Sequence, residues 1–232
     1  MLRALSSLVI PLVMCGSAAA HDPKLHVAQV GGGAPPPDPN IVVRVNPYAI
    51  FVKGTLWKKM PIAVCWENPS RSNDRERGLV KDAVQRTWVA AANVSFSGWQ
   101  ACKPEARGIR IRIADRVPDS RIGTYIDAKP DGMHLNFTFD NWGGPEMKAN
   151  RIHWIRYNAV HEFGHALGLD HEQNHPDNPG DCKKDTELLN TVSATPYDRG
   201  SVMGYCNPRM HKEWSLSKWD KEGMVTAYGP RR

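Results

Sequence analysis

Apolar and polar residues alternate most strictly in residues 108–115, and a period of two residues is that of a β-strand with one buried face. Residues 132–140 alternate in the same way. Shorter apolar runs at 60–68 and 94–99 predict two further strands. The apolar side of the two alternating strands consists of Ile109, Ile111, Ile113, Met133, Leu135, Phe137 and Phe139.

Three other segments carry apolar residues at the spacing of an α-helix, namely residues 74–92, 149–168 and 215–229. The second is expected to end at Gly168 and the third at Gly229, because glycine accepts the positive φ of a helix end. Strands and helices together predict an α+β domain. The predicted N-caps are Asn73 or Asp74 in the first helix, Asn150 or a slightly earlier residue in the second, and a serine in the third.

The chain has 232 residues, enough for one domain with short extensions. Residues 1–20 predict a secretory signal peptide, because a basic residue precedes a short apolar core that is followed by small residues. Residues 21–53 contain GGGAPPPDPN and predict a pro-segment or linker, since glycine and proline disfavour helices and central strands. The globular domain is therefore expected at residues 54–230, in a secreted, periplasmic or extracellular monomer.

The formal net charge of +6 and the sequence pI near 9.1 do not by themselves indicate a nucleic-acid partner. Residues 71–77 mix both signs, and the arginines of residues 108–115 alternate with apolar residues. Such a distribution is typical of solvated surface charge, so we expect no nucleic-acid binding. No segment is apolar for long enough to span a bilayer, so we expect no stable membrane insertion.

Export also affects how the cysteines are interpreted. Cys65, Cys102, Cys182 and Cys206 form an even set, which an oxidising compartment favours as two disulfides. Of the three possible pairings, Cys65–Cys102 with Cys182–Cys206 is favoured because each pair stays within one half of the chain. A second metal site is the competing interpretation, although no Cys-x-x-Cys spacing supports it.

The most informative segment has the sequence HEFGHALGLDH. His161 and His165 are four residues apart and share a helix face. Gly168 permits the sharp turn by which His171 can return to the same ion. Three neutral imidazoles leave a fourth position on a zinc ion open for water. We therefore expect one catalytic Zn²⁺ held by His161, His165 and His171, with no other cofactor.

Glu162 follows the first of these histidines, close to a metal-bound water without being a ligand itself. Zinc lowers the pKa of such a water from near 16 to about 7 and polarises the scissile carbonyl. Glu162 can accept the water's proton and pass it to the leaving amine. The segment thus predicts a zinc-dependent endopeptidase that acts on protein or peptide substrates.

Together with a second segment, Ser201-Val202-Met203-Gly204-Tyr205, this motif resembles the metzincin clan of metallopeptidases. The resemblance implies that Met203 forms a methionine turn beneath the zinc site. Tyr205 follows two residues later, as in the astacin and serralysin groups, and is implied to be a displaceable fifth ligand that stabilises the oxyanion. His171-Glu172-Gln173 continues as in astacins, which implies that Glu172 helps to fix a matured N-terminus.

Several features depart from these groups. Gly204 replaces the histidine usual in astacins, and no glycine-rich calcium repeats of the serralysin type are present. The predicted pro-segment lacks the cysteine motif of matrixin zymogens and the aspartate motif of astacin zymogens. The likeness covers roughly residues 56–229, of which 161–173 and 201–205 are specific. Subfamily, activation step and substrate therefore stay open.

The resemblance implies a metzincin-like zincin domain with a twisted mixed sheet and two helices above a cleft. A small lower subdomain would hold the methionine turn and the C-terminal helix. An edge strand binds extended substrate in this clan, and we assign that role to residues 132–140, which carry His134; a plain core strand is the alternative. His175 is a candidate fourth ligand, disfavoured because a closed site leaves no room for water.

Two other functions are weighed against the peptidase. The first is a zinc-stabilised binding protein without proteolytic activity, against which Glu162 argues, because a structural zinc site needs no base. The second is zinc-dependent hydrolysis of a non-peptide bond, which the sequence does not suggest.

Overall fold

The structure is a computed structural model that describes residues 50–184, 191–193 and 195–231. The predicted signal peptide and most of the predicted pro-segment lie outside these residues. Residues 50–52 form strand β1 (Ile50–Val52), upstream of residue 54, where the sequence patterns place the start of the globular domain. None of the helices in the described ranges has the length and apolar character needed to cross a membrane.

A five-stranded mixed sheet is the larger of two sheets, with the strand order β3-β2-β4-β6-β5. Four strands run parallel, and β5 runs antiparallel to β6. Ile109 and Ile111 of the central strand β4 are fully buried, as predicted, but Arg110 between them is buried as well and does not lie on the solvated face that the alternation predicts. The strands are β2 (Ile62–Trp66), β3 (Phe96–Ala101), β4 (Ile109–Ile113), β5 (Asp119–Ser120) and β6 (Met133–Leu135).

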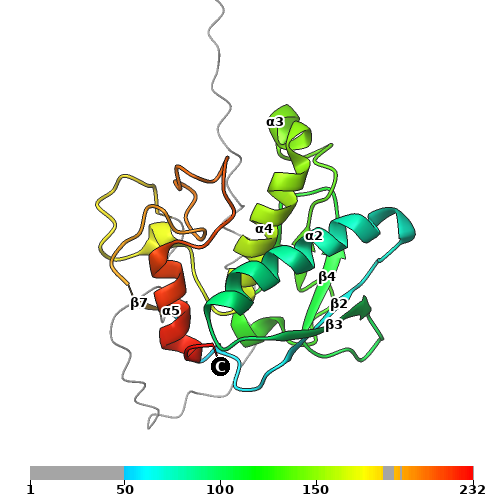
Figure 1. Cartoon of the computed structure of the whole chain (residues 1–232), viewed down its shortest axis with the longest axis horizontal. Coiled ribbons are helices and arrows are strands. Elements are labelled where there is room, and N and C mark those ends of the chain that lie inside the picture. The colour runs from blue at the N-terminus through cyan, green and yellow to red at the C-terminus, as the bar shows by residue number, and fades with distance from the viewer. Residues whose placement is uncertain (1–49, 185–190, 194, 232) are drawn as a thin grey trace, which may run out of the picture.

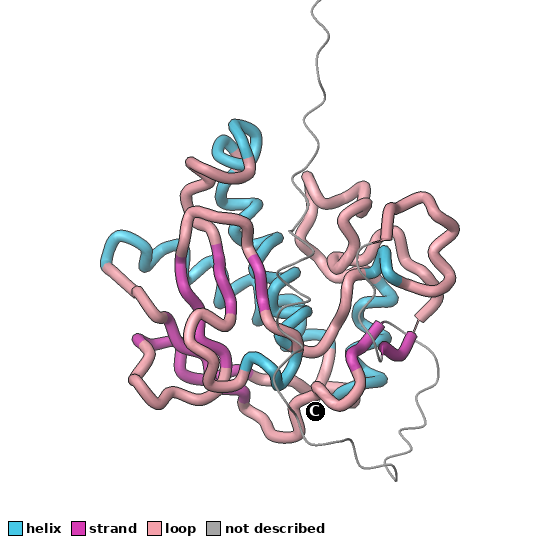
Figure 2. Tube along the Cα trace, turned by 180° about the vertical axis from the view of Figure 1, so that it is seen from behind, coloured by secondary structure: helices cyan, strands magenta, loops and turns pink. Residues whose placement is uncertain are grey.

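Helices α2 and α4 pack against each other across one face of this sheet (Figure 1), and Figure 2 shows the strands from the opposite side. A π-helical turn continues α2, and from it Trp88 Nε1 donates to Val160 O of α4 at 2.8 Å. All three predicted helices are present close to their expected ends. The helical segments are α2 (Asp74–Val84), the turn Gln85–Val89, α3 (Gly144–Ala149), α4 (Arg151–Ala166) and α5 (Lys218–Tyr228).

The second sheet has two strands, β1 and β7 (Thr191–Ser193), paired antiparallel. Helix α5 lies near β7 in Figure 1. The other edge of β1 pairs with the chain just after α4, because Val52 N donates to Gly168 O at 3.0 Å and Asp170 N donates to Ile50 O at 2.9 Å. The first described residues of the chain are thus joined to the turn that precedes His171.

The edge of the large sheet differs from the sequence prediction. Strand β6, within residues 132–140, pairs with β4 on one side and with β5 on the other. The assignment of these residues to the edge strand is therefore wrong, and β5 takes that position. Strand β5 has only two paired residues, Asp119 and Ser120, which is too short for an alternating pattern to be recognised.

Strand β6 is also shorter than predicted, because Asn136 bends the chain after Leu135. The Asn136 Oδ1 atom accepts hydrogen bonds from Thr138 N at 3.0 Å and Phe139 N at 2.8 Å. Phe139 has a φ of 56°, a conformation that bulky residues rarely adopt. Hydrogen bonds from the backbone to the Asn136 side chain compete with those between strands. The strand therefore ends at Leu135, although apolar and polar residues continue to alternate beyond it.

Both predicted disulfides are present, Cys65–Cys102 and Cys182–Cys206. The predicted pairing is confirmed. The first disulfide joins the segment after β3 to the central part of the sheet. The second ties the chain after α4 to the residue that follows Tyr205.

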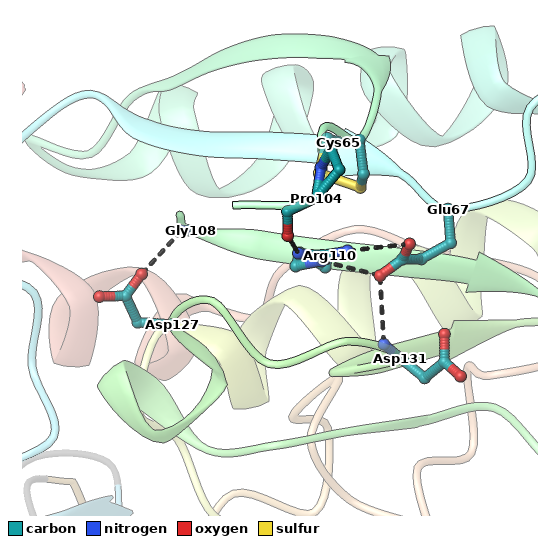
Figure 3. The surroundings of a disulfide bond; sticks show 8 residues. Cys65, Glu67, Pro104, Gly108, Arg110, Asp127 and Asp131 are labelled. Carbon is teal, nitrogen blue, oxygen red and sulfur yellow. Dashed lines mark hydrogen bonds and ion pairs between the residues drawn. A yellow bond between two sulfur atoms is a disulfide. The ribbon is translucent and has the colours of Figure 1, made fainter. Parts of the chain in front are cut away.

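An almost buried ion pair lies beside the first disulfide (Figure 3). Arg110 donates from Nε to Glu67 Oε1 at 2.8 Å and from Nη1 to Pro104 O at 2.7 Å. The hydrogen bond from Arg110 lowers the pKa of Glu67 despite its burial. Because Cys102 is bonded to Cys65, the disulfide and the ion pair together hold the segment around Pro104 on the sheet.

Candidate metal centre

The three histidines of the predicted site meet at one point. Nε2 of His171 lies 3.3 Å from Nε2 of His161 and 3.0 Å from Nε2 of His165. All three side chains are buried. Nitrogen ligands placed tetrahedrally at about 2.0–2.1 Å from zinc stand roughly 3.3 Å apart. Both separations are close to the spacing that one zinc ion requires, and the ligand atoms of the three histidines all lie within 4.8 Å of one another.

The turn at the end of α4 brings the third histidine to the other two. It is a Schellman motif, in which Leu169 N donates to Gly164 O at 3.0 Å and Gly168 N donates to His165 O at 2.8 Å. Gly168 has a φ of +100°, which side chains rarely allow. The predicted role of this glycine is confirmed, since the turn sends the chain back so that His171 faces α4.

Hydrogen bonds to backbone carbonyls fix the orientation of two of the imidazole rings. His161 Nδ1 lies 2.8 Å from Val202 O, and His165 Nδ1 lies 2.8 Å from Leu169 O. A carbonyl oxygen can only accept, so each Nδ1 carries a proton. This tautomer leaves the Nε2 lone pair available for a metal ion, which is the usual arrangement around metal-binding histidines.

Glu162 is fully buried in α4 beside these histidines. Its burial raises the pKa of the carboxyl to about 8, and the charge of Asp119 acts in the same direction. The nearby His161 acts in the opposite direction and favours the ionised form. Burial by itself thus favours the protonated carboxyl.

Tyr205 and Met203 both lie at the histidine cluster. The Tyr205 hydroxyl is 2.8 Å from His171 Nε2, so it reaches the point at which the three nitrogen atoms converge. Met203 packs directly against α4 between the first two histidines: a Cβ atom added to Gly164 would lie 2.3 Å from Met203 Sδ. The structure therefore brings the tyrosine and the methionine of the second motif to the site.

The residues after the third histidine bind the segment that carries Met203. Glu172 N donates to Met203 O at 3.1 Å, and Tyr205 N donates to Gln173 Oε1 at 3.2 Å. The Glu172 carboxylate accepts a hydrogen bond from Asp198 N at 2.7 Å, and burial raises its pKa to about 9. Its implied contact with a matured N-terminus stays a prediction.

Two further histidines considered from the sequence have other partners. His175 lies 2.5 Å through Nε2 from Thr195 O, and its Nδ1 accepts from Asp177 N at 3.0 Å. Both ring nitrogens are thereby engaged, and the metal-ligating cluster among the described residues does not include His175. His134 Nδ1 lies 2.9 Å from Asp119 Oδ1 of the edge strand.

Several residues that hold the site have little or no signal in the sequence. Asp220 is the residue among them that does have a sequence signal, because Ser217 and Asp220 have the spacing of a helix capping box. The others are distant in sequence from the histidines they support, so no local pattern indicates them. Their contacts are Val52 N to Gly168 O (3.0 Å), Asp170 N to Ile50 O (2.9 Å), Trp57 Nε1 to Ala166 O (2.8 Å) and Tyr228 Oη to Leu167 O (2.7 Å).

Comparison with solved structures identifies the fold. The structure of myroilysin superposes with a TM-score of 0.56 at 21% sequence identity, covering 78% of this chain and 98% of that chain. The medaka (Oryzias latipes) high choriolytic enzyme 1, described as a hatching enzyme zinc-protease, gives a TM-score of 0.47 at 19% identity and covers 76% and 96%. No family model and no curated protein sequence matches the chain. The likeness to myroilysin confirms the metzincin-like α+β fold expected from the sequence.

Proposed function

We propose that this protein is an exported zinc-dependent endopeptidase in which His161, His165 and His171 hold one zinc ion. The observation that carries the proposal is the meeting of three histidine Nε2 atoms and the Tyr205 hydroxyl at one point. The buried carboxyl of Glu162 is the general base. The metzincin-like fold supports this assignment, because two of the histidines lie on helix α4 and the turn after that helix brings the third histidine to them.

The donor set suits a catalytic zinc site better than a structural one. Structural zinc sites are closed by four protein ligands, whereas catalytic sites have three and keep one position for water or substrate. The cluster among the described residues consists of three histidines. When bound, zinc supplies a positive charge that acidifies water and polarises the carbonyl of the scissile peptide bond.

Glu162 and Tyr205 have different tasks in the reaction: the first transfers a proton and the second donates a hydrogen bond. Glu162 takes up the proton of the attacking water molecule and later delivers it to the leaving amine nitrogen. Burial favours the protonated carboxyl, which helps Glu162 to hold that proton between the two steps. The Tyr205 hydroxyl lies 2.8 Å from His171 Nε2 and so reaches the metal centre. There it donates a hydrogen bond to the substrate carbonyl oxygen as negative charge develops on that oxygen.

Export is supported by the two disulfides, because such bonds persist in oxidising compartments. The basic, apolar and small residues of positions 1–20 have the order of a signal peptide. We therefore propose that the protein acts on proteins or peptides outside the cell or in a periplasm.

The direct test is cleavage of an unfolded protein by the purified chain, with and without a zinc chelator, beside Glu162→Ala. We expect chelation to abolish cleavage and added zinc to restore it. The Glu162→Ala variant should keep its zinc and lose activity by about 100-fold or more. Glu105→Ala, which removes an exposed carboxylate, is the matched control and should cleave like the wild type.

One outcome contradicts the proposal. If the wild type and Glu162→Ala both hold stoichiometric zinc and are equally inert in every matured form, the protein is not a peptidase. A zinc-stabilised binding protein would then be the better description.

A further inference from the structure

Hydrogen bonds lead from both ends of helix α5 towards the metal centre. Asp220 lies in its first turn and Tyr228 is its last residue. Eight residues at 1.5 Å per residue place them about 12 Å apart along the helix. Each of these side chains bonds to a different piece of backbone that orients a histidine.

At the beginning of α5, the Asp220 carboxylate holds the segment around Met203. Oδ1 accepts from Ser201 Oγ at 2.6 Å, and Oδ2 accepts from Val202 N at 3.0 Å and from Ser217 N at 2.9 Å. Asp220 is 4% exposed, so these bonds are shielded from water and are correspondingly strong.

The peptide of Val202 links this carboxylate to the first histidine. Val202 N donates to Asp220, and Val202 O accepts from His161 Nδ1 at 2.8 Å. Because Val202 makes both hydrogen bonds, one through its N–H and one through its carbonyl oxygen, a displacement of Val202 would rotate the ring of His161. Asp220 thereby acts on His161 through a single intervening residue.

At the other end of α5, Tyr228 holds the turn that carries the third histidine. Its hydroxyl donates to Leu167 O at 2.7 Å. This carbonyl lies at the C-terminal end of α4, where the last carbonyl groups of a helix find no donor within the helix. Two residues later, Leu169 O accepts from His165 Nδ1 at 2.8 Å. The same turn leads into His171, so Tyr228 restrains the backbone on which two of the three histidines depend.

We propose that Asp220 and Tyr228 are positioning residues of the metal centre, and that α5 braces the three histidines from both of its ends. The inference rests on the metal site of the proposed function but not on peptide hydrolysis. Groups hydrogen-bonded to metal ligands typically contribute 10- to 100-fold to metal affinity, and Asp220 and Tyr228 act one step further out, on the backbone that carries those groups. Loss of either brace is expected to weaken zinc binding by about 10-fold in a chain that remains folded.

The test compares the wild type with Asp220→Asn, Tyr228→Phe and the control Thr226→Ala. Thr226 lies on the same helix and donates only to Glu222 O within it. Each purified full-length chain is titrated with zinc against a competing chelator, and its Co²⁺ form is examined by visible absorption, which reports the coordination geometry. Circular dichroism establishes that each chain is folded.

We expect both positioning variants to bind zinc about 10-fold more weakly and to show an altered Co²⁺ spectrum, while Thr226→Ala matches the wild type. A purely structural role would lower the melting temperature and leave both readouts unchanged, which would overturn the inference. If Asp220→Asn does not fold, Ser201→Ala removes one of the same bonds and is judged by the same criteria. A wild type that binds no zinc would overturn the proposed metal site and this inference with it.

Discussion

Single residues decide the proton chemistry of the site, and Glu162 shows this most clearly. A carboxyl that is fully buried resists ionisation, and this effect raises its pKa to about 8. A zinc ion bound by the neighbouring histidines would act in the opposite direction, because its positive charge favours the carboxylate. The pKa of Glu162 in the zinc-bound protein therefore depends on two opposing effects. Burial favours the protonated carboxyl, and the zinc ion favours the carboxylate.

The balance predicts the acid side of the pH profile. Because the base must be ionised, kcat/KM should fall as the pH is lowered through the pKa of Glu162. With zinc bound, we expect the midpoint above 4.5, the ordinary value for glutamate, and below about 8. Measuring kcat/KM from about pH 4 to about pH 9 locates it. A profile that stays flat across this range in folded protein would exclude Glu162 as the base.

The hydroxyl of Tyr205 can be tested by itself. Tyr205→Phe removes the group that lies 2.8 Å from His171 Nε2 and leaves the ring in place. Loss of one donor to a developing oxyanion typically costs about 100-fold in kcat, with little change in KM. Zinc content should remain that of the wild type. Unchanged turnover would remove the role assigned to this hydroxyl.

At the scale of elements, α4 packs so closely against the side chain of Met203 that a Cβ atom at position 164 would force a neighbouring side chain to move. A Cβ atom on Gly164 would lie 2.3 Å from Met203 Sδ and 3.1 Å from Trp88 Cζ2. Alanine favours a helix over glycine, so local propensity and packing oppose each other at this position.

We predict that packing prevails. Gly164→Ala should lower the free energy of unfolding by about 1–3 kcal/mol, as overpacked cores do. The control is Gly78→Ala in α2, where nothing lies within 4 Å of the added Cβ and a gain of about 0.4–1 kcal/mol is expected. Urea unfolding of both variants measures the difference. Two variants of equal stability would contradict the close approach of Met203.

The elements that sequence predicts well are those whose signals are local. Helical periodicity and Gly168 define α4 and its end, and strict alternation defines β4. The same criterion misassigns the sheet edge, since β5 is too short to show a period. It also extends β6 too far, because the hydrogen bonds of Asn136 bend a chain whose apolar alternation continues.

At the scale of the whole molecule, the two disulfides close loops of different importance to the site. Cys65 and Cys102 are 37 residues apart and lie on the sheet, whereas Cys182 and Cys206 are 24 residues apart and Cys206 follows Tyr205. Loops of these lengths correspond to about 3–4 kcal/mol of stabilisation each in the chain-entropy model.

We predict a different effect on turnover for the two bonds. Replacing either cysteine pair by alanine should lower the free energy of unfolding by about 3–4 kcal/mol. Only the Cys182/Cys206 variant should also turn over more slowly per folded molecule, because it frees the chain next to Tyr205. Denaturant unfolding and kcat, measured on both variants, decide this. Equal kcat values would show that the second disulfide does not position the tyrosine.

The long-range contacts are what sequence patterns do not predict. The three histidines lie within one motif of eleven residues, and their convergence follows from a helix, a glycine and a turn. The strand that supports this turn comes from Ile50–Val52, and the tyrosine that caps it is Tyr228. Such contacts join residues that are far apart in the sequence and depend on the tertiary fold, so local periodicity and motif spacing do not predict them.

The central claim is that one zinc ion, held by three histidines, serves peptide hydrolysis. It is tested most directly by adding zinc stepwise to metal-free protein and measuring the rate of peptide cleavage after each addition. We predict a rate that rises linearly and levels off at about one zinc ion per chain. Cleavage that proceeds without zinc, or a rate that stays at zero when one zinc ion is bound, would contradict it.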